Sequence, residues 1–91
     1  MKIEVTEQVR NFIRDCPPVP RRWLRDAVRK LAEEKGDIKV MDGELAGYCR
    51  LRIRSYRIIF RYVNGKSGRM IRCDFAEHRG VVYEAFMRVR E

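Results

Sequence analysis

The segment GYCRLRIRSYR, residues 47–57, alternates apolar and basic side chains from Cys49 to Arg54. A two-residue period of this kind is typical of a β-strand with one buried face and one exposed face. If Cys49, Leu51 and Ile53 face the core, the intervening arginines point out of the other face at intervals of about 7 Å. Neighbouring like charges repel one another, so the segment predicts a surface that binds an anion.

The whole chain is short and strongly basic. It has 91 residues, with 21 Lys and Arg against 13 Asp and Glu, and a formal net charge of +8 at pH 7. At this length we expect a single domain, residues 1–91, with one compact core. Nucleic acid, an anionic membrane surface or an acidic protein would each suit the charge. The excess of arginine over lysine favours forked, bidentate recognition of phosphate.

Cysteine spacing and hydropathy argue against several classes of protein. Cys16, Cys49 and Cys73 form an odd set without CxxC spacing, which disfavours a disulfide framework and a zinc site and indicates small core residues. The N-terminal segment lacks the apolar run of a secretion signal, and no segment approaches the ~18 apolar residues of a membrane span. We therefore expect a cytoplasmic protein that does not insert in a membrane and has neither a disulfide framework nor a zinc site.

Hydrophobic periodicity predicts two helices in the first half of the chain, after a possible short strand within residues 1–5. The first helix is capped by Thr6 and must stop before Pro17. The second begins near Pro20 and ends at Gly36. Their expected inward residues are Val9, Phe12, Ile13 and Cys16 in the first helix and Leu24, Ala27, Val28 and Leu31 in the second.

Strand patterns dominate the second half. Residues 37–47 contain two glycines and no sustained period, so we expect a connector there. Three strands should follow, at about 48–54, 56–63 and 69–77, with short connections that make neighbours antiparallel. A short C-terminal helix is expected within residues 79–90. Its inward residues should be Val82, Phe86 and Val89.

These elements predict an α+β fold, with two N-terminal helices packed on one face of a small antiparallel sheet and a short C-terminal helix. The other face of the sheet would be free. Arg50, Arg52 and Arg54 would then point into solvent from that face. Five further arginines fall in the same half of the chain, and an RNA backbone would relieve their mutual repulsion. They are Arg57, Arg61, Arg69, Arg72 and Arg79.

Two blocks of this sequence, LAGYCRLRIRSYRIIFRY at residues 45–62 and HRGVVY at 78–83, resemble known motifs. They are similar to the L-x-G-x-Y-R-L-R core and the closing H-R-x-x-x-Y of RelE-type toxins, in the RelE/ParE superfamily of bacterial toxin–antitoxin modules. The resemblance is strong over about residues 45–84, whereas the first half agrees in layout and length. It implies a RelE-like fold and a metal-independent endoribonuclease that cuts messenger RNA, in many members in the ribosomal A site.

The resemblance also implies roles for individual residues. Arg50, Arg52 and Arg57 would hold the scissile phosphate while the 2′-hydroxyl of the RNA attacks it, leaving a 2′,3′-cyclic phosphate. Arg79 and Tyr83 would assist the leaving group and position the base or the 2′-hydroxyl. Because Arg79 and Tyr83 are four residues apart, they would share one face of a helix.

Proton transfer needs a group other than arginine, because arginine stays protonated, so Arg50 and Arg52 are poor general bases. Tyr83 could transfer the proton if nearby arginines stabilise its phenolate. His78 is the second candidate, since imidazole titrates closest to neutral pH, although a structural role would also suit it. The residues expected to bind RNA outside this catalytic set are Arg54 and Arg61.

The aromatic residues also have two interpretations. Trp23 and the alternating Tyr56, Phe60 and Tyr62 could stack on RNA bases, but their positions follow the burial periods and favour core packing. Ile58 shares the expected face of that strand.

The resemblance implies a cognate acidic antitoxin as a partner, which also sets the oligomeric state, together with messenger RNA and the ribosomal A site. Two other hypotheses remain. One is a ParE-like toxin that inhibits DNA gyrase, against which the HRGVVY block argues, and the other is a basic RNA-binding module without catalysis.

Overall fold

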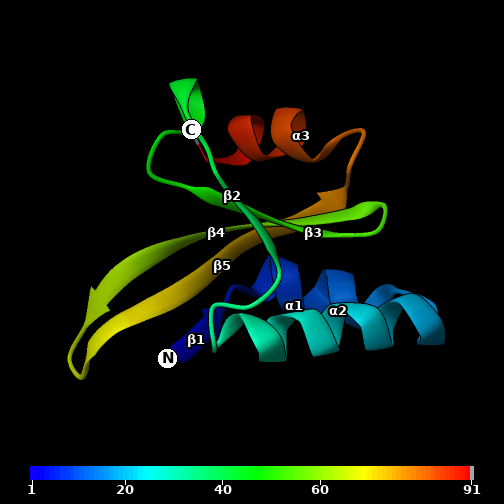
Figure 1. The fold of residues 1–91 in the computed structure, drawn as a ribbon. Helices are drawn as coiled ribbons and strands as arrows, with labels where there is room; N and C mark the ends of the chain where they lie inside the picture. The colour runs from blue at the N-terminus through cyan, green and yellow to red at the C-terminus, as the bar shows by residue number, and fades with distance from the viewer. Residues whose placement is uncertain (91) are drawn as a thin grey trace.

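Nine elements make up the part of the chain that the computed structural model describes, residues 1–90. In chain order they are β1 (Lys2–Val5), α1 (Glu7–Asp15), α2 (Pro18–Leu31), β2 (Asp37–Val40), a 3-10 turn (Gly43–Leu45), β3 (Cys49–Ile53), β4 (Tyr56–Gly65), β5 (Gly68–His78) and α3 (Val82–Val89). The strands form one sheet in the order β1-β5-β4-β3-β2. Helices α1 and α2 lie on one face of it and α3 lies on the other (Figure 1).

The two N-terminal helices begin as the sequence predicts. The hydroxyl of Thr6 accepts a hydrogen bond from the Val9 amide at 3.4 Å and donates one to the Asp74 carbonyl at 2.9 Å. The first contact caps α1, and the second ties its start to β5. Helix α1 ends before Pro17, which begins the turn into α2.

The second helix is shorter than predicted, because it ends at Leu31 rather than near Gly36. Gly36 instead lies at the entry to β2, with a φ of +136°. A Cβ atom there would lie 2.8 Å from Cδ1 of Leu51, so only glycine fits this close approach of the chain to β3.

The sheet differs from the prediction at both edges. The hairpins β3–β4 and β4–β5 are antiparallel as predicted, but β1 pairs with β5 in parallel, so the sheet is mixed. The expected connector at residues 37–47 contains β2, which pairs antiparallel with β3, and also the 3-10 turn. Both edge strands have four residues, which is too few for a clear hydrophobic period.

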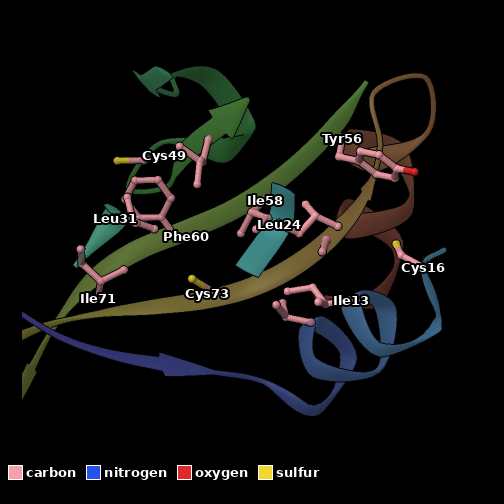
Figure 2. Close-up of a cluster of buried hydrophobic side chains, with 13 residues drawn as sticks. Ile13, Cys16, Leu24, Leu31, Cys49, Tyr56, Ile58, Phe60, Ile71 and Cys73 are labelled. Carbon is pink, nitrogen blue, oxygen red and sulfur yellow. The ribbon is translucent and has the colours of Figure 1, made fainter. Parts of the chain in front are cut away.

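The main core lies between the sheet and helices α1 and α2. It gathers Leu24 and Leu31 of α2 with Ile58 and Phe60 of β4 in one buried cluster (Figure 2). Tyr56 and Tyr62 lie on the same face, which confirms the predicted alternation along β4. The cysteines are also buried, as predicted, and burial raises the pKa of the Cys73 thiol to about 12. None of the helices within residues 1–90 is long and apolar enough to cross a membrane.

The other face of the sheet is partly covered, so the prediction of a free face is wrong. Helix α3 packs Val82 and Phe86 onto it, together with Ile59, Phe75 and Leu45. The prediction that Val89 points inward is also wrong, because this last residue of α3 is 63% exposed. Only the earlier part of α3 therefore supplies the apolar contact, and the remaining part of this face carries charged side chains.

Candidate active site

An open cleft of about 400 Å³ lies beside α3, on the face of the sheet that this helix partly covers. We call it the arginine cleft. Strands β2, β3 and β4, the turn after β5, and α3 all contribute side chains to it. The residues that line it are Lys39, Met41, Arg50, Arg52, Arg57, Arg79 and Tyr83.

Strand register gathers the cations of the arginine cleft. Arg52 lies directly opposite Arg57 of β4, and Arg50 lies directly opposite Lys39 of β2. Directly opposed residues of an antiparallel pair have Cβ atoms about 5 Å apart, so each of these pairs brings two positive charges side by side. This confirms that Arg50 and Arg52 share one face, opposite the buried Leu51.

One carboxylate offsets part of this charge. Asp37 lies opposite Arg52 in the sheet, and its Oδ2 is 2.6 Å from both Nε and Nη2 of that arginine. Its Oδ1 is 3.6 Å from Nη1 of Arg50. The Arg50 side chain is only 14% exposed, whereas that of Arg52 is 56% exposed. Five cations around one paired carboxylate leave a net positive cleft, which suits a phosphate.

Arg57 and Arg79 are both held by contacts with the β3–β4 turn. Nη1 of Arg57 donates to the carbonyls of Arg54 and Tyr56, each at 2.8 Å. The backbone amide of Arg79 donates to the carbonyl of Ser55 at 2.8 Å. These contacts bring the segment after β5 next to the turn, so that the guanidinium groups of Arg57 and Arg79 line one cavity.

Tyr83 enters the cleft from α3. Its half-buried side chain packs against the cluster beneath this helix and also lines the cleft. The prediction that Arg79 and Tyr83 share a helical face is wrong, because α3 begins at Val82 and Arg79 lies in the preceding turn. The two side chains still meet in one cavity, since that turn folds back toward the sheet.

Three other candidate residues lie outside the arginine cleft. His78 lies on the opposite face, with its ring centroid 4.8 Å from that of Tyr56 and 5.9 Å from that of Phe12. Arg61 shares the face that carries α3, but its Nε donates to Asp74 at 3.1 Å. The third residue is Arg54.

The prediction that Arg54 shares a face with Arg50 and Arg52 is wrong. Strand β3 ends at Ile53, so the alternation stops there, and Arg54 enters the hairpin turn with a φ of +52°. Its guanidinium lies 4.1 Å from the ring centroid of Trp23, on the side of the sheet covered by α2. Trp23 is partly buried against the main core, as its helical position predicts.

Sequence reasoning missed the contribution of β2. Lys39 and Met41 line the cleft, and Asp37 pairs with its arginines, yet all three fall in the expected connector. Asp37 and Lys39 do alternate with Ile38 and Val40, but four residues are too few to distinguish a strand from a connector.

Solved structures of toxins share this fold at low sequence identity. A YoeB/ParE toxin from Agrobacterium tumefaciens matches with a TM-score of 0.67 and 19% identity, over 86% of this chain and 98% of that one. A chain of the RelB–RelE antitoxin–toxin complex from Methanococcus jannaschii matches with a TM-score of 0.63 and 23% identity, over 91% and 98%. A chain of the RelE–RelB complex from Pyrococcus horikoshii matches with a TM-score of 0.58 and 23% identity, over 87% of this chain and 94% of that one.

No protein-family model matches the sequence, and a search of curated proteins found no match. The fold is nevertheless of one class, that of the small α+β toxins of toxin–antitoxin complexes. More narrowly, it is similar to the folds of the YoeB/ParE toxin and of the chains matched in the two RelE–RelB complexes, which confirms the RelE-like fold that the sequence resemblance implies.

Proposed function

We propose that this protein is the toxin of a toxin–antitoxin module and a metal-independent endoribonuclease that cleaves messenger RNA on the ribosome. One observation carries the proposal: four arginines and a phenol, from separate segments of the chain, converge on one open cleft. Cleavage by the RNA's own 2′-hydroxyl requires in-line geometry, stabilisation of the pentacoordinate phosphorane and proton transfer at two oxygens. The lining of the cleft supplies groups for each requirement.

The proposed roles follow the position of each side chain. Arg50, Arg52 and Arg57 hold the non-bridging oxygens of the phosphate and stabilise the charge that grows on them. Arg79, in the turn between β5 and α3, stabilises the departing 5′-oxygen. Tyr83 moves the proton at one of the two oxygens, since its hydroxyl is the group in the lining that can both donate and accept, and solvent water in the open cleft exchanges the proton at the other oxygen.

Independence from metal ions follows from the donor set of the cleft. Lys39 and the four arginines are cations, which repel a divalent ion, and the nearby carboxylate of Asp37 already pairs with Arg52. Guanidinium groups therefore take the electrostatic role that a metal ion plays in many other nucleases.

The proposed partner is an acidic antitoxin that covers the arginine cleft. The similar structures from Methanococcus jannaschii and Pyrococcus horikoshii are antitoxin–toxin complexes. A formal net charge of +8 on this chain favours an acidic segment as the inhibitor, because opposite charge speeds and stabilises association. Such a segment would compete with RNA for the same arginines.

A second candidate function is inhibition of DNA gyrase without RNA cleavage. It is favoured by the similarity to the structure described as a YoeB/ParE toxin. It differs from the main proposal in its target, which would be an enzyme and not RNA. It therefore predicts blocked supercoiling of plasmid DNA and intact messenger RNA.

The deciding experiment adds the purified protein to translating ribosomes in buffer in which EDTA is balanced by enough Mg²⁺ to keep the ribosomes assembled but no other metal remains. We expect cuts that end in a 2′,3′-cyclic phosphate. Tyr83→Phe should slow the cleavage step and leave RNA binding unchanged, and an unchanged rate would remove the hydroxyl from the mechanism. Intact message together with inhibited gyrase would select the second function instead.

A further inference from the structure

A second cavity, of about 280 Å³, adjoins the arginine cleft around the β2 edge of the sheet. We call it the Trp23–Arg54 pocket. Arg52 lines both cavities, and Asp37, which pairs with Arg52, lines the second one as well. A strand of RNA held at Arg52 would therefore reach the pocket without crossing the core.

A stacked pair forms one wall of the pocket. The guanidinium of Arg54 lies over the indole of Trp23, 4.1 Å from its centroid. The indole packs against the main core and supports the guanidinium from one side, while Arg54 is exposed to solvent. One face of the guanidinium is thus covered and the other is available, and RNA bases stack on arginine planes held in this way.

The backbone at Arg54 is itself unusual. A φ of +52° is a conformation that glycine or asparagine adopts more readily than arginine. Strained residues of this kind concentrate at functional sites, where the side chain matters more than the ease of the turn. Here the strained turn places the guanidinium over Trp23 and directly follows the strand that carries Arg52.

The rest of the lining suits a flat, anionic ligand. Leu51 and Ile53 supply apolar surface, and Lys30 and Lys35 add positive charge. The two carboxylates that line the pocket are both paired, Asp26 with Arg29 at 3.0 Å and Asp37 with Arg52 at 2.6 Å. A base with its phosphate would find a stacking surface, apolar contact and cations in this one pocket.

We propose that the Trp23–Arg54 pocket binds one base of the RNA strand whose phosphate lies in the arginine cleft, stacked on the outer face of the Arg54 guanidinium. This inference rests on the proposed function and extends it to a nucleotide that flanks the cut. Arg52 and Arg54 both line this pocket, and Arg52 also lines the arginine cleft, so neighbouring nucleotides of one strand can contact both residues. An acidic peptide would use the lysines of the pocket, but it would not require a planar stack.

The experiment uses Trp23, the single tryptophan of the chain, as the reporter. We expect its fluorescence to change when the protein is titrated with a single-stranded RNA of about ten nucleotides. Arg54→Gly should raise the apparent Kd at least tenfold, because one base stack is lost and glycine keeps the turn at positive φ. Arg54→Lys, which keeps the charge but loses the plane, should weaken binding nearly as much.

Two controls separate stacking from attraction between opposite charges. Arg14→Ala removes an equal charge from an exposed position on α1 and should change the Kd less than threefold. An abasic strand of the same length and charge should bind wild type and Arg54→Lys with equal affinity, because the two proteins carry the same charge and the strand has no base to stack. Equal Trp23 responses to abasic strand, polyglutamate and RNA would overturn the proposal in favour of an acidic partner, and no response to any of them would also overturn it.

The outcome can be distinguished from failure of the nuclease proposal. A base-dependent Trp23 response without cleavage on ribosomes would leave the pocket in place and reject the nuclease. Cleavage on ribosomes that Arg54→Gly leaves unchanged, with no base-dependent response, would reject the pocket alone.

Discussion

The two faces of the sheet are built for different purposes. The face under α1 and α2 is apolar across β3, β4 and β5, and it buries large side chains such as Phe60 and Leu24 completely. The face under α3 has a smaller apolar cluster beside a cleft rich in arginine. Alternation along β3 therefore separates stability from candidate function, since Leu51 packs into the main core and Arg50 and Arg52 line the arginine cleft on the other face.

The largest expected effect is a loss of stability on the face covered by α1 and α2. Phe60→Ala should reduce the free energy of unfolding by about 3–5 kcal/mol, because it removes a fully buried ring and leaves a cavity in the main core. Urea denaturation followed by circular dichroism measures the loss. Phe60→Leu is the matched control and should cost about half as much or less. A loss below about 1 kcal/mol for Phe60→Ala would show that this face does not carry the stability.

The arginine face should show the opposite pattern. Arg79→Ala is expected to reduce RNA cleavage by about 10²-fold, equivalent to ~2.7 kcal/mol of transition-state stabilisation, because it removes a preorganised donor. Stability should change by less than about 0.5 kcal/mol, since the side chain is exposed. Arg88→Ala, on the outer side of α3 and paired with Glu84, is the control. A mild effect on cleavage would make the arginine cleft only a binding surface.

The length of each element, and how far along the chain its partner lies, explain which parts of the fold could be predicted. Three strands and two amphipathic helices extend over enough residues to show a period, so their positions follow from the sequence. The parallel pairing of β1 with β5 joins residues about 68 positions apart, such as Ile3 and Ile71, and no local pattern encodes it. The register between β4 and β5 also skips Asp74, and this bulge turns Phe75 toward α3. A strict alternation along β5 would have placed Phe75 on the opposite face, with Cys73.

The candidate site was predictable to a similar extent. Alternation alone placed Arg50 and Arg52 on one face, whereas only resemblance to toxin motifs brought Arg57, Arg79 and Tyr83 into the same site. Arg54 was misplaced because a period cannot show where a strand ends and a turn begins. Lys39 was missed because its edge strand is short.

Asp37 allows a sharper comparison within the charged face. Asp37→Asn removes the carboxylate that competes with phosphate for Arg50 and Arg52, so RNA should bind up to about fivefold more tightly. Folding should lose less than about 1 kcal/mol, since the Asp37–Arg52 pair is largely exposed.

Titrations of RNA binding at several salt concentrations measure this effect. Glu84→Gln, which removes a carboxylate from the outer side of α3, is the matched control and should leave binding nearly unchanged. Weaker binding by Asp37→Asn would mean that the carboxylate orients the arginines instead of competing for them.

The smallest expected effect on stability is beside the main core, where Tyr62 donates a hydrogen bond to Oε1 of Glu34 at 2.7 Å. This bond and burial raise the pKa of Tyr62 to about 12. An unfolded tyrosine ionises near 10, so folding favours the protonated phenol. Its contribution to stability is therefore complete below about pH 10 and is lost as the pH rises toward 12.

Tyr62→Phe removes the donor and the titrating group together. At pH 8 we expect a loss of no more than about 1 kcal/mol, typical of one partly exposed hydrogen bond. Between pH 10 and 12 the unfolding free energy of the variant should fall less steeply than that of the wild type, because one proton fewer is released. Urea denaturation at pH 8, 10, 11 and 12 measures both slopes. Parallel slopes would show that the phenol keeps its ordinary pKa and that Glu34 does not hold its proton in the folded chain.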